Sequence, residues 1–410
     1  MLSALLPLLA AAPAHAISID NLSPRLDANG SIVNAHDGTI RWLDGAWWVH
    51  AASYGAGNCT DPPHTGCERV PGEVPCGFQG NHNVTMFRSP DLTSGSWEWQ
   101  GDAVRCEDLP NCKILYRPHL VWNPRTRLYV LFYNYIKKNT PHPGSAAIGV
   151  ATASSPAGPF TVRNHAISNA RPVLATNYYG SMGDFDVFVD ADDTAYIVYS
   201  FGPMSIEQLS PDYLNGTDTN ASFPGGGFGG TVLPIEFTEA PSLWQRGETY
   251  FLTTGHCCCF CWQGSGMITY VASHPLGPWR RQPGPPDIGC VANSSNPTPV
   301  KQKTLPLTAQ VSPGQGCNYL GARAASVSRA QQNFVLPIHT ADGGVSYVWT
   351  GDRWMQAPDG TKAHEPQSWL KLTFAGEVLL PLRWSDTLEL NVLVPQPPFP
   401  PPPREDVGRH

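Results

Sequence analysis

Three carboxylates stand at the beginning of short apolar stretches that are predicted to form β-strands, at Asp37, Asp184 and Glu239. Each stretch continues into a polar turn and then into a second, aromatic-rich stretch. If the three strands converge, like charges at close quarters raise at least one carboxyl pKa, so that an acid stays protonated near neutral pH and can donate to a leaving group. Two carboxyls flanking a bond are the arrangement that glycoside cleavage requires.

Each carboxylate also has an ordinary structural interpretation. Asp37 precedes Gly38 and is compatible with a turn, Asp184 begins a locally acidic hairpin, and Glu239 is compatible with a surface acid near Pro241. The spacing along the chain does not give the separation of the carboxyls. A separation of about 6.5–9.5 Å implies inversion, and one of about 5–5.5 Å implies a covalent intermediate and retention.

The layout of strand, turn and strand occurs five times, which predicts the elements that must position these groups. The first strands are expected at 32–42, 116–122, 184–189, 239–244 and 325–328, and the second strands at 46–50, 128–132, 195–199, 249–255 and 333–337. The phrase at 151–160 recurs at 271–279 and is expected to form the outer two strands of a four-stranded unit. Radial repetition of such units indicates an all-β, five-bladed β-propeller; a β-sandwich with coincidental hairpins is the alternative.

In a propeller the first strand of each blade lines the central channel, and the residues that open these strands meet at one mouth. The alignment of the five copies places there the three carboxylates, Tyr116 or Arg117, and the region 321–325.

Composition supports a β-rich protein and excludes some partners. Phe, Trp and Tyr make up 10% of the 410 residues and charged residues only 14%, with 39 Gly and 41 Pro as frequent turn signals. The formal net charge of −7 argues against a nucleic-acid partner and an anionic membrane surface. No run after the N-terminus is long enough to span a bilayer.

The termini and cysteines indicate an extracellular protein. Residues 1–16 resemble a secretory signal, although the usual Lys or Arg is absent; 17–394 are expected to form the propeller domain and 395–410 a Pro-rich, disordered tail. Eleven Cys favour an oxidising compartment and disulfide bonds. Six Asn-x-Ser/Thr sites are compatible with a glycoprotein, at Asn21, Asn58, Asn83, Asn215, Asn220 and Asn293.

Several short stretches, in order along most of residues 32–384, resemble glycoside hydrolase family 43, and among its members the exo-β-1,3-galactanase branch. They are Asn34-Ala35-His36, Arg117-Pro118, Asp184 four residues before Phe188, Glu239-Ala240-Pro241, Gln331 with Phe334-Val335-Leu336-Pro337, and Gly351-Asp352-Arg353-Trp354.

The resemblance implies that Glu239 is the general acid and that Asp184 positions and tunes it. Members of the family generally carry the base at the position of Asp37, whereas the galactanase branch tends to have Gly there and is thought to use a Gln that matches Gln331. A carboxylate accepts a proton from water and a neutral amide does not, so we expect Asp37 to be the base and Gln331 to orient substrate or water. The expected substrate-binding residues are His36, Tyr116, Arg117, His256, Trp262 and Gln331.

Two features depart from that branch. Tyr116 stands where the branch has Glu, which puts specificity for galactan in doubt. The fourth unit continues into a cluster of His256, Cys257, Cys258, Cys259 and Cys261. Disulfides suit this cluster better than zinc, because neighbouring residues of a strand point to opposite faces.

The sequence therefore predicts a secreted, extracellular glycoside hydrolase, exo-acting on β-1,3-galactan-like or arabinan- or xylan-like chains with inversion. The expected partner is a polysaccharide or oligosaccharide, with no nucleic acid or membrane, and the protein is expected to be a monomer. No organic cofactor is implied, and a structural Ca²⁺ is compatible with such propellers. A retaining, fructosidase-like propeller and a catalytically inactive carbohydrate-binding propeller are the alternatives.

Overall fold

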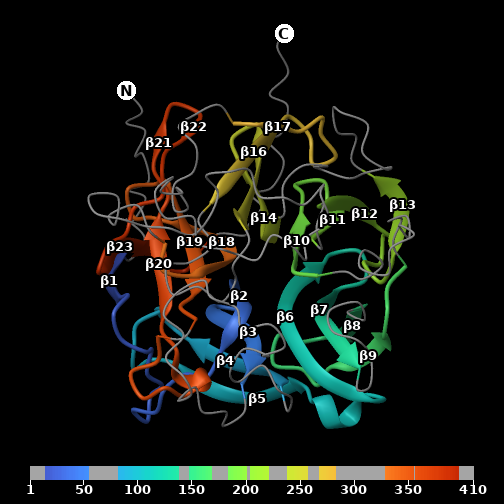
Figure 1. Cartoon of the computed structure of the whole chain (residues 1–410), viewed down its shortest axis with the longest axis horizontal. Helices are drawn as coiled ribbons and strands as arrows, with labels where there is room; N and C mark the ends of the chain where they lie inside the picture. The colour runs from blue at the N-terminus through green and yellow to red at the C-terminus, as the bar shows by residue number, and fades with distance from the viewer. Residues whose placement is uncertain are drawn as a thin grey trace, which may run out of the picture.

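The computed structural model describes residues 14–54, 82–137, 147–168, 183–200, 204–220, 238–256, 267–282, 328–354 and 356–396. These residues form a five-bladed β-propeller, as predicted (Figure 1). Each blade is an antiparallel sheet built in chain order from an inner to an outer strand, which is the arrangement expected when consecutive strands are joined by short hairpins.

Four blades have four strands each among the described residues. The first is β2 (His36–Leu43), β3 (Ala46–Ser53), β4 (Asn83–Ser89) and β5 (Glu98–Val104), and the second is β6 (Cys112–Asn123), β7 (Leu128–Lys137), β8 (Ala147–Ala153) and β9 (Thr161–Asn164). The third is β10 (Phe185–Val189), β11 (Ala195–Tyr199), β12 (Ser205–Leu209) and β13 (Gly216–Asn220), and the fourth is β14 (Thr238–Arg246), β15 (Thr249–His256), β16 (Ile268–Ala272) and β17 (Arg280–Arg281).

The local sequence explains the hairpins. Leu43 pairs with Ala46, so Asp44-Gly45 is a two-residue loop, and both loop residues have positive φ (48° and 78°), as the predicted Asp-Gly hairpin requires. The recurring phrase covers the end of the third strand and the connection to the fourth in blades two and four, so it lies in the outer half of each blade as expected but does not form both outer strands. Its Gly-Pro bonds at Gly158 and Gly277 are cis.

The fifth blade corrects the predicted register. Its described strands are β18 (Gln331–His339), β19 (Val345–Asp352) and β20 (Gln367–Lys371), so the stretch Asn333–Pro337 belongs to the inner strand and not to the second. The predicted turn at 329–332 instead leads into β18, and the hairpin turn lies between His339 and Val345. Of the predicted inner strand at 325–328, only Ser328 is described, and it precedes β18; residues 321–327 lie outside the described residues.

The five inner strands touch in cyclic order, β2, β6, β10, β14, β18 and again β2. Separate clusters of buried apolar side chains fill the spaces between neighbouring blades. Burial of this apolar surface supplies the main stabilisation of each contact between blades.

A belt of hydrogen bonds also joins the inner strands around the axis. The backbone N–H of Leu120 donates to Thr39 Oγ1 at 3.4 Å, His119 Nδ1 lies 3.0 Å from Asp186 Oδ1, and Leu243 N–H donates to Asp186 Oδ2 at 2.9 Å. Ser242 Oγ donates to Asp186 Oδ2 at 3.0 Å and accepts from the N–H of Val335 at 2.9 Å. We refer to Thr39, His119, Asp186 and Ser242 as the axial belt. Its members are buried, and each contacts a residue of a neighbouring inner strand, so they hold neighbouring blades in register.

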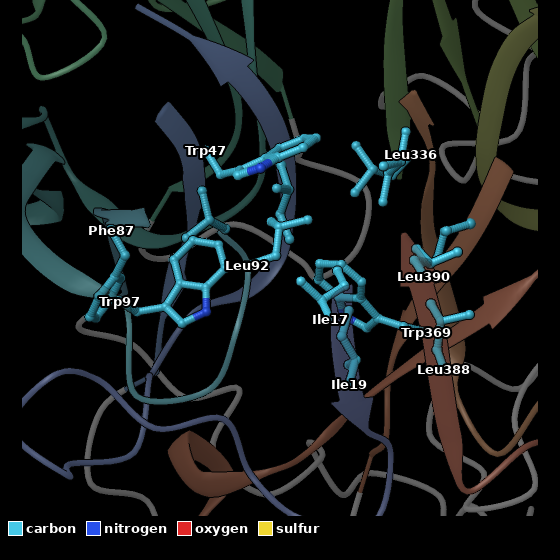
Figure 2. Close-up of a cluster of buried hydrophobic side chains, with 14 of the residues drawn as sticks. Ile17, Ile19, Trp47, Phe87, Leu92, Trp97, Leu336, Trp369, Leu388 and Leu390 are labelled. Atoms are coloured by element: carbon cyan, nitrogen blue, oxygen red, sulfur yellow. The ribbon is translucent and has the colours of Figure 1, made fainter. Parts of the chain in front are cut away.

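The two ends of the described chain close the ring. β1 (Ala14–Asp20) pairs with β23 (Thr387–Leu393) beside the seam between blades one and five. Ile17, Leu388 and Leu390 pack there with Trp369 of β20 and Leu336 of β18 (Figure 2). A short hairpin of β21 (Phe374–Ala375) and β22 (Val378–Leu379) follows β20.

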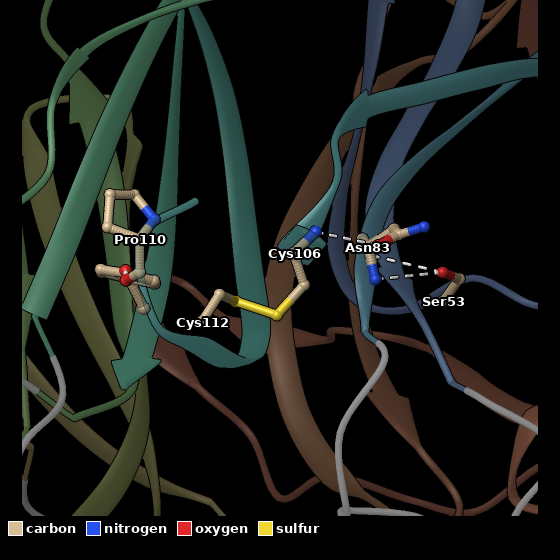
Figure 3. Close-up of a disulfide and its surroundings, with 6 residues drawn as sticks. Ser53, Asn83, Cys106, Pro110 and Cys112 are labelled. Atoms are coloured by element: carbon tan, nitrogen blue, oxygen red, sulfur yellow. Dashed lines mark hydrogen bonds between the residues drawn. A yellow bond between two sulfur atoms is a disulfide. The ribbon is translucent and has the colours of Figure 1, made fainter. Parts of the chain in front are cut away.

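A disulfide between Cys106 and Cys112 links the end of the first blade to the start of the second (Figure 3). The short 3₁₀ helix η1 (Cys106–Asp108) lies within this link, and Asn83 Oδ1 accepts the N–H of Cys106 at 3.0 Å. Among the predicted glycosylation sites, Asn21 is fully buried, and its side chain donates to the carbonyls of Trp369 and Ser385. Asn21 is therefore not accessible to a glycan in the folded protein.

Candidate active site

Four of the five inner strands have a backbone irregularity near the end that faces the predicted mouth. The register shifts between His36 and Thr39 in β2, Tyr116 and His119 in β6, Glu239 and Ser242 in β14, and Gln332 and Val335 in β18. In three of these bulges a residue other than glycine has positive φ: Asp37 (58°), Arg117 (53°) and Ala240 (53°). Bulges re-aim side chains, and backbone in this region persists only where surrounding contacts hold it.

Gly38 shows how tight the first bulge is. A Cβ atom on Gly38 would lie 2.0 Å from the carbonyl oxygen of His50, so only glycine fits next to Asp37. Proline stands at the matching position of the second and fourth blades, Pro118 and Pro241. Proline suits such a position because a bulge removes a hydrogen bond from the ladder.

Arg117 and Asp184 form a buried ion pair at the mouth. Arg117 Nε lies 3.2 Å from Asp184 Oδ1, its Nη2 donates to Oδ2 at 3.3 Å, and its Nη1 donates to the carbonyl of Gln332 at 2.7 Å. Burial opposes the charge on Arg117, but Asp184 and then Asp37 outweigh it and raise the pKa of the guanidinium. The side chain of Asp184 is 15% exposed and that of Arg117 only 2%, so the carboxylate faces the opening and the cation supports it.

Gln331 completes the support of Asp184. Its Nε2 donates to Asp184 Oδ2 at 3.1 Å, and its Oε1 accepts the indole N–H of Trp354 at 2.9 Å. The amide orientation is therefore fixed by two partners. The structure thus brings together Arg117, Asp184 and Gln331, three of the predicted site residues, from three different blades.

Asp37 occupies a more enclosed position, since it is only 3% exposed. The Tyr54 hydroxyl donates to its Oδ2 at 2.6 Å, and its own backbone N–H donates to Oδ2 of a second buried carboxylate, Asp352, at 2.6 Å. Burial and then the charge of Asp352 raise the pKa of Asp37 to about 7, although Arg117 acts in the opposite direction. Asp37 therefore changes its charge near neutral pH.

Tyr116 lies within electrostatic reach of all three predicted catalytic carboxylates. Burial and then Asp184 raise the pKa of the Tyr116 phenol, and the charges of Asp37 and Glu239 add to the effect. Glu239 is half-buried at the start of the β14 bulge, where it pairs with Gly255 of β15. The charges of all three carboxylates therefore act on Tyr116, and the charge of Arg117 acts in the opposite direction.

The remaining predicted site residues differ in position. His36 is 1% exposed, and its Nε2 lies 3.2 Å from the carbonyl of Ala363, so it packs behind Asp37 and not on the open side. The backbone of His256 ends β15 opposite Thr238. Trp262 and the Cys257–Cys261 cluster lie outside the described residues.

Sequence reasoning missed the groups that support Asp37. They are Tyr54, Asp352 and Lys362 of the 3₁₀ helix η5 (Lys362–His364), whose ammonium lies 4.1 Å from the centre of the Tyr54 ring. Asp352 belongs to the Gly351-Asp352-Arg353-Trp354 stretch, which contributed to the family resemblance, but the sequence assigned no role to Asp352 itself. Nothing in the local sequence of Tyr54 or Lys362 indicates that either lies near Asp37.

Among the described residues, no group of three or more His, Cys, Asp or Glu side chains is arranged to hold a metal ion. That part of the chain also contains no helix with the length and apolarity needed to cross a bilayer.

Comparisons with known proteins agree on one family. Residues 76–303 match the family model described as Glycosyl hydrolases family 43. No curated protein matches the chain.

Solved structures of similar fold include a GH43 β-1,3-galactosidase, with 18% identity and a TM-score of 0.62, covering 92% of this chain and 64% of that one. The chain thus spans less than two thirds of that protein's length. An exo-β-1,3-galactanase from Clostridium thermocellum has 20% identity and a TM-score of 0.63, covering 91% of this chain and 67% of that one. A variant of an exo-β-1,3-galactanase from Phanerochaete chrysosporium with β-1,3-galactotriose has 18% identity and a TM-score of 0.59, covering 90% and 67%.

Proposed function

Because the chain belongs to glycosyl hydrolases family 43, and is therefore a glycoside hydrolase, we propose that it is a secreted enzyme that removes sugars from the ends of β-1,3-galactan-like chains with inversion. The observation that carries this proposal is the contact network at the starts of the inner strands, where Arg117 and Gln331 hold Asp184 and Asp352 holds the backbone of Asp37, together with the charges of Asp37, Asp184 and Glu239 that all act on Tyr116. Hydrolysis of a glycosidic bond needs an acid and a base on opposite sides of the bond, and this cluster offers both.

In the proposed mechanism Glu239 protonates the leaving oxygen while Asp37 takes a proton from the attacking water. Glu239 and Asp37 open β14 and β2, so they approach the axis from different blades. Asp184, fixed by Arg117 and Gln331, orients Glu239 and the sugar. As positive charge develops on the sugar ring in the transition state, nearby carboxylates stabilise it.

The choice of galactan rests on two solved structures of similar fold, a β-1,3-galactosidase and an exo-β-1,3-galactanase. Tyr116 is the observation that favours another sugar, since a carboxylate is expected at this position in a galactanase and a buried phenol lies there. Arabinan- or xylan-like chains are therefore the second candidate.

Secretion is supported by the composition of residues 1–16, by the eleven Cys and by the Cys106–Cys112 disulfide. Disulfides persist mainly in oxidising compartments.

The test is release of reducing sugar from β-1,3-galactan, arabinan, xylan and fructan by the wild type, Glu239→Gln and Glu248→Gln. Glu248 is exposed in the turn at the far end of the β14 hairpin, so Glu248→Gln is the matched control and should keep full activity. We expect activity on galactan, about 10²–10⁴-fold lower in Glu239→Gln. If the wild type is active only on arabinan or xylan, the galactan proposal is wrong. If Glu239→Gln keeps its activity, Glu239 is not the general acid.

The stereochemistry is tested by proton NMR of the first sugar released. Inversion predicts that the anomer opposite to the substrate linkage appears first and then mutarotates. First appearance of the same anomer would contradict a general base and indicate a covalent intermediate.

A further inference from the structure

We propose that Asp352 is a positioning residue for Asp37: it holds Asp37 in its bulge and sets the pH range over which Asp37 can act as a base. This inference rests on the proposed role of Asp37. Asp352 comes from β19 of the fifth blade and Asp37 from β2 of the first, so the contact crosses the seam where the propeller closes.

A hydrogen bond to Asp352 holds the backbone of Asp37 in an unfavourable conformation. Asp37 has a φ of 58°, which a residue with a side chain adopts only when other contacts hold it. The contact that does so is the hydrogen bond from its backbone N–H to Asp352 Oδ2, at 2.6 Å. Asp352 is fully buried, so this bond is shielded from competition by water.

The side chain of Asp352 is itself fixed by a hydrogen bond from Gln367. Its Oδ1 accepts from Gln367 Nε2 at 2.9 Å, and the same nitrogen donates to the carbonyl of Ala35 at 2.8 Å. Gln367 Oε1 in turn accepts from Arg25, whose guanidinium carbon lies 4.7 Å from the centre of the Trp369 ring and 5.3 Å from that of Trp97. A continuous chain of contacts therefore leads from the stacked Arg25 to the backbone of Asp37.

The charges that act on Asp37 come from three other elements. Asp352 of β19 acts on it with negative charge, while Arg117 of β6 and Lys362 of η5 act with positive charge, and Lys362 is itself paired with the buried Glu365. The Tyr54 hydroxyl, just after β3, donates to Asp37, and His36 on its own strand lies against Asp352, with 3.6 Å between Nδ1 and Oδ1. Asp352 is the group among these that opposes ionisation of Asp37 by its charge.

The two carboxyls differ in which one keeps the proton. Burial alone would raise the pKa of Asp352, but the nearby His36 imidazole and the charge of Lys362 outweigh it and hold that pKa well below its usual range. Asp352 therefore stays charged, whereas Asp37, whose pKa is about 7, is the carboxyl that takes up a proton near neutral pH. As pH falls through this value, Asp37 becomes protonated and can no longer accept a proton from water.

The test is the pH profile of kcat/KM for the wild type, Asp352→Asn, Asp352→Ser and Asp359→Asn. Asparagine can still accept the N–H of Asp37 but carries no charge, so we expect the acidic limb to move to lower pH by about one unit or more. A purely structural role would lower activity without moving the limb. Asp359 is an exposed acid in the same region of the chain, so Asp359→Asn should leave the limb in place. An unmoved limb in a folded Asp352→Asn or Asp352→Ser would overturn the proposal.

Should neither variant fold, the thermal midpoint of Asp37→Asn supplies the second measurement. The raised pKa of Asp37 disfavours folding increasingly between its unfolded value of about 4 and its folded value of about 7, so Asp37→Asn should raise the thermal midpoint over the wild type more at pH 8 than at pH 5. Equal differences at both pH values would overturn the proposal. The failure of the proposed function looks different: if Asp37→Asn keeps its activity, Asp37 is not the base. If Asp37→Asn is inactive but the acidic limb of the kcat/KM profile does not move in the Asp352 variants, only the positioning inference fails.

Discussion

Asp37 and Asp184 are the same type of residue at the same end of the axis, but they lie in contrasting surroundings. Asp184 is partly exposed and contacts Arg117 and Gln331, which both donate to its carboxylate. Asp37 is enclosed and lies against a second carboxylate, Asp352, while the neutral hydroxyl of Tyr54 donates to its own carboxyl. Two donors hold Asp184 in place, whereas burial and a neighbouring charge make Asp37 a stronger base, so the surroundings assign different tasks to identical side chains.

The largest difference should appear when each acid is neutralised. Asp37→Asn removes the base, and we expect kcat to fall by about 10²–10⁴-fold, because an amide does not accept a proton from water. A small anion such as azide should partly restore turnover of an activated substrate by Asp37→Ala, since it replaces the attacking water. Asp184→Asn should lower activity without rescue by azide. Equal rescue of both variants would remove the contrast in their roles.

Arg117→Lys tests the support of Asp184. Lysine keeps the charge but loses the fork that contacts both Asp184 oxygens and the carbonyl of Gln332, so we expect kcat to fall by ~10–100-fold. The measurement is kcat together with the midpoint of thermal unfolding. Unchanged kcat would show that the position of Asp184 does not depend on this ion pair.

Asp186→Asn sharpens the comparison within one strand, because Asp186 lies two residues from Asp184 but belongs to the axial belt. An amide can replace only part of the contacts to His119, Ser242 and the N–H of Leu243, so the free energy of unfolding should fall by ~1–3 kcal/mol. We expect kcat to stay within about threefold of wild type, since the group is buried away from substrate. Denaturant unfolding measures the change in stability. A large loss of kcat without a loss of stability would show that Asp186 acts in the active site and not only in the axial belt.

Tyr54→Phe should give the smallest effect. It removes the donor to Asp37 Oδ2, which disfavours the charged form and raises the carboxyl pKa further. The acidic limb of kcat/KM should therefore move to higher pH by about 0.3–1 unit, in the direction opposite to that expected for Asp352→Asn. A shift to lower pH would mean that this hydroxyl does not stabilise the Asp37 anion.

Much of the fold could be predicted because it depends on local signals. The Asp44-Gly45 hairpin, the inner strands of the first four blades and the Pro-Gly connections each follow from residues close in the chain. The fifth blade was misjudged because Gln331-Gln332-Asn333 is a polar run of the kind found in turns. In the folded protein these residues are buried, and the Gln332 amide donates to the carbonyls of Ala240 and Thr253 and accepts from the indole of Trp349. Partners that lie up to 92 residues away leave no local trace.

The sequence by itself determined the repeated strands, the type of each candidate acid and the carboxylates that open the inner strands. Tertiary structure alone decided their surroundings, because pKa and orientation depend on charges brought near by other blades. Asp352 lies 315 residues from Asp37 along the chain and 2.6 Å from its backbone nitrogen. That proximity exists only because closure of the ring sets the first blade against the fifth.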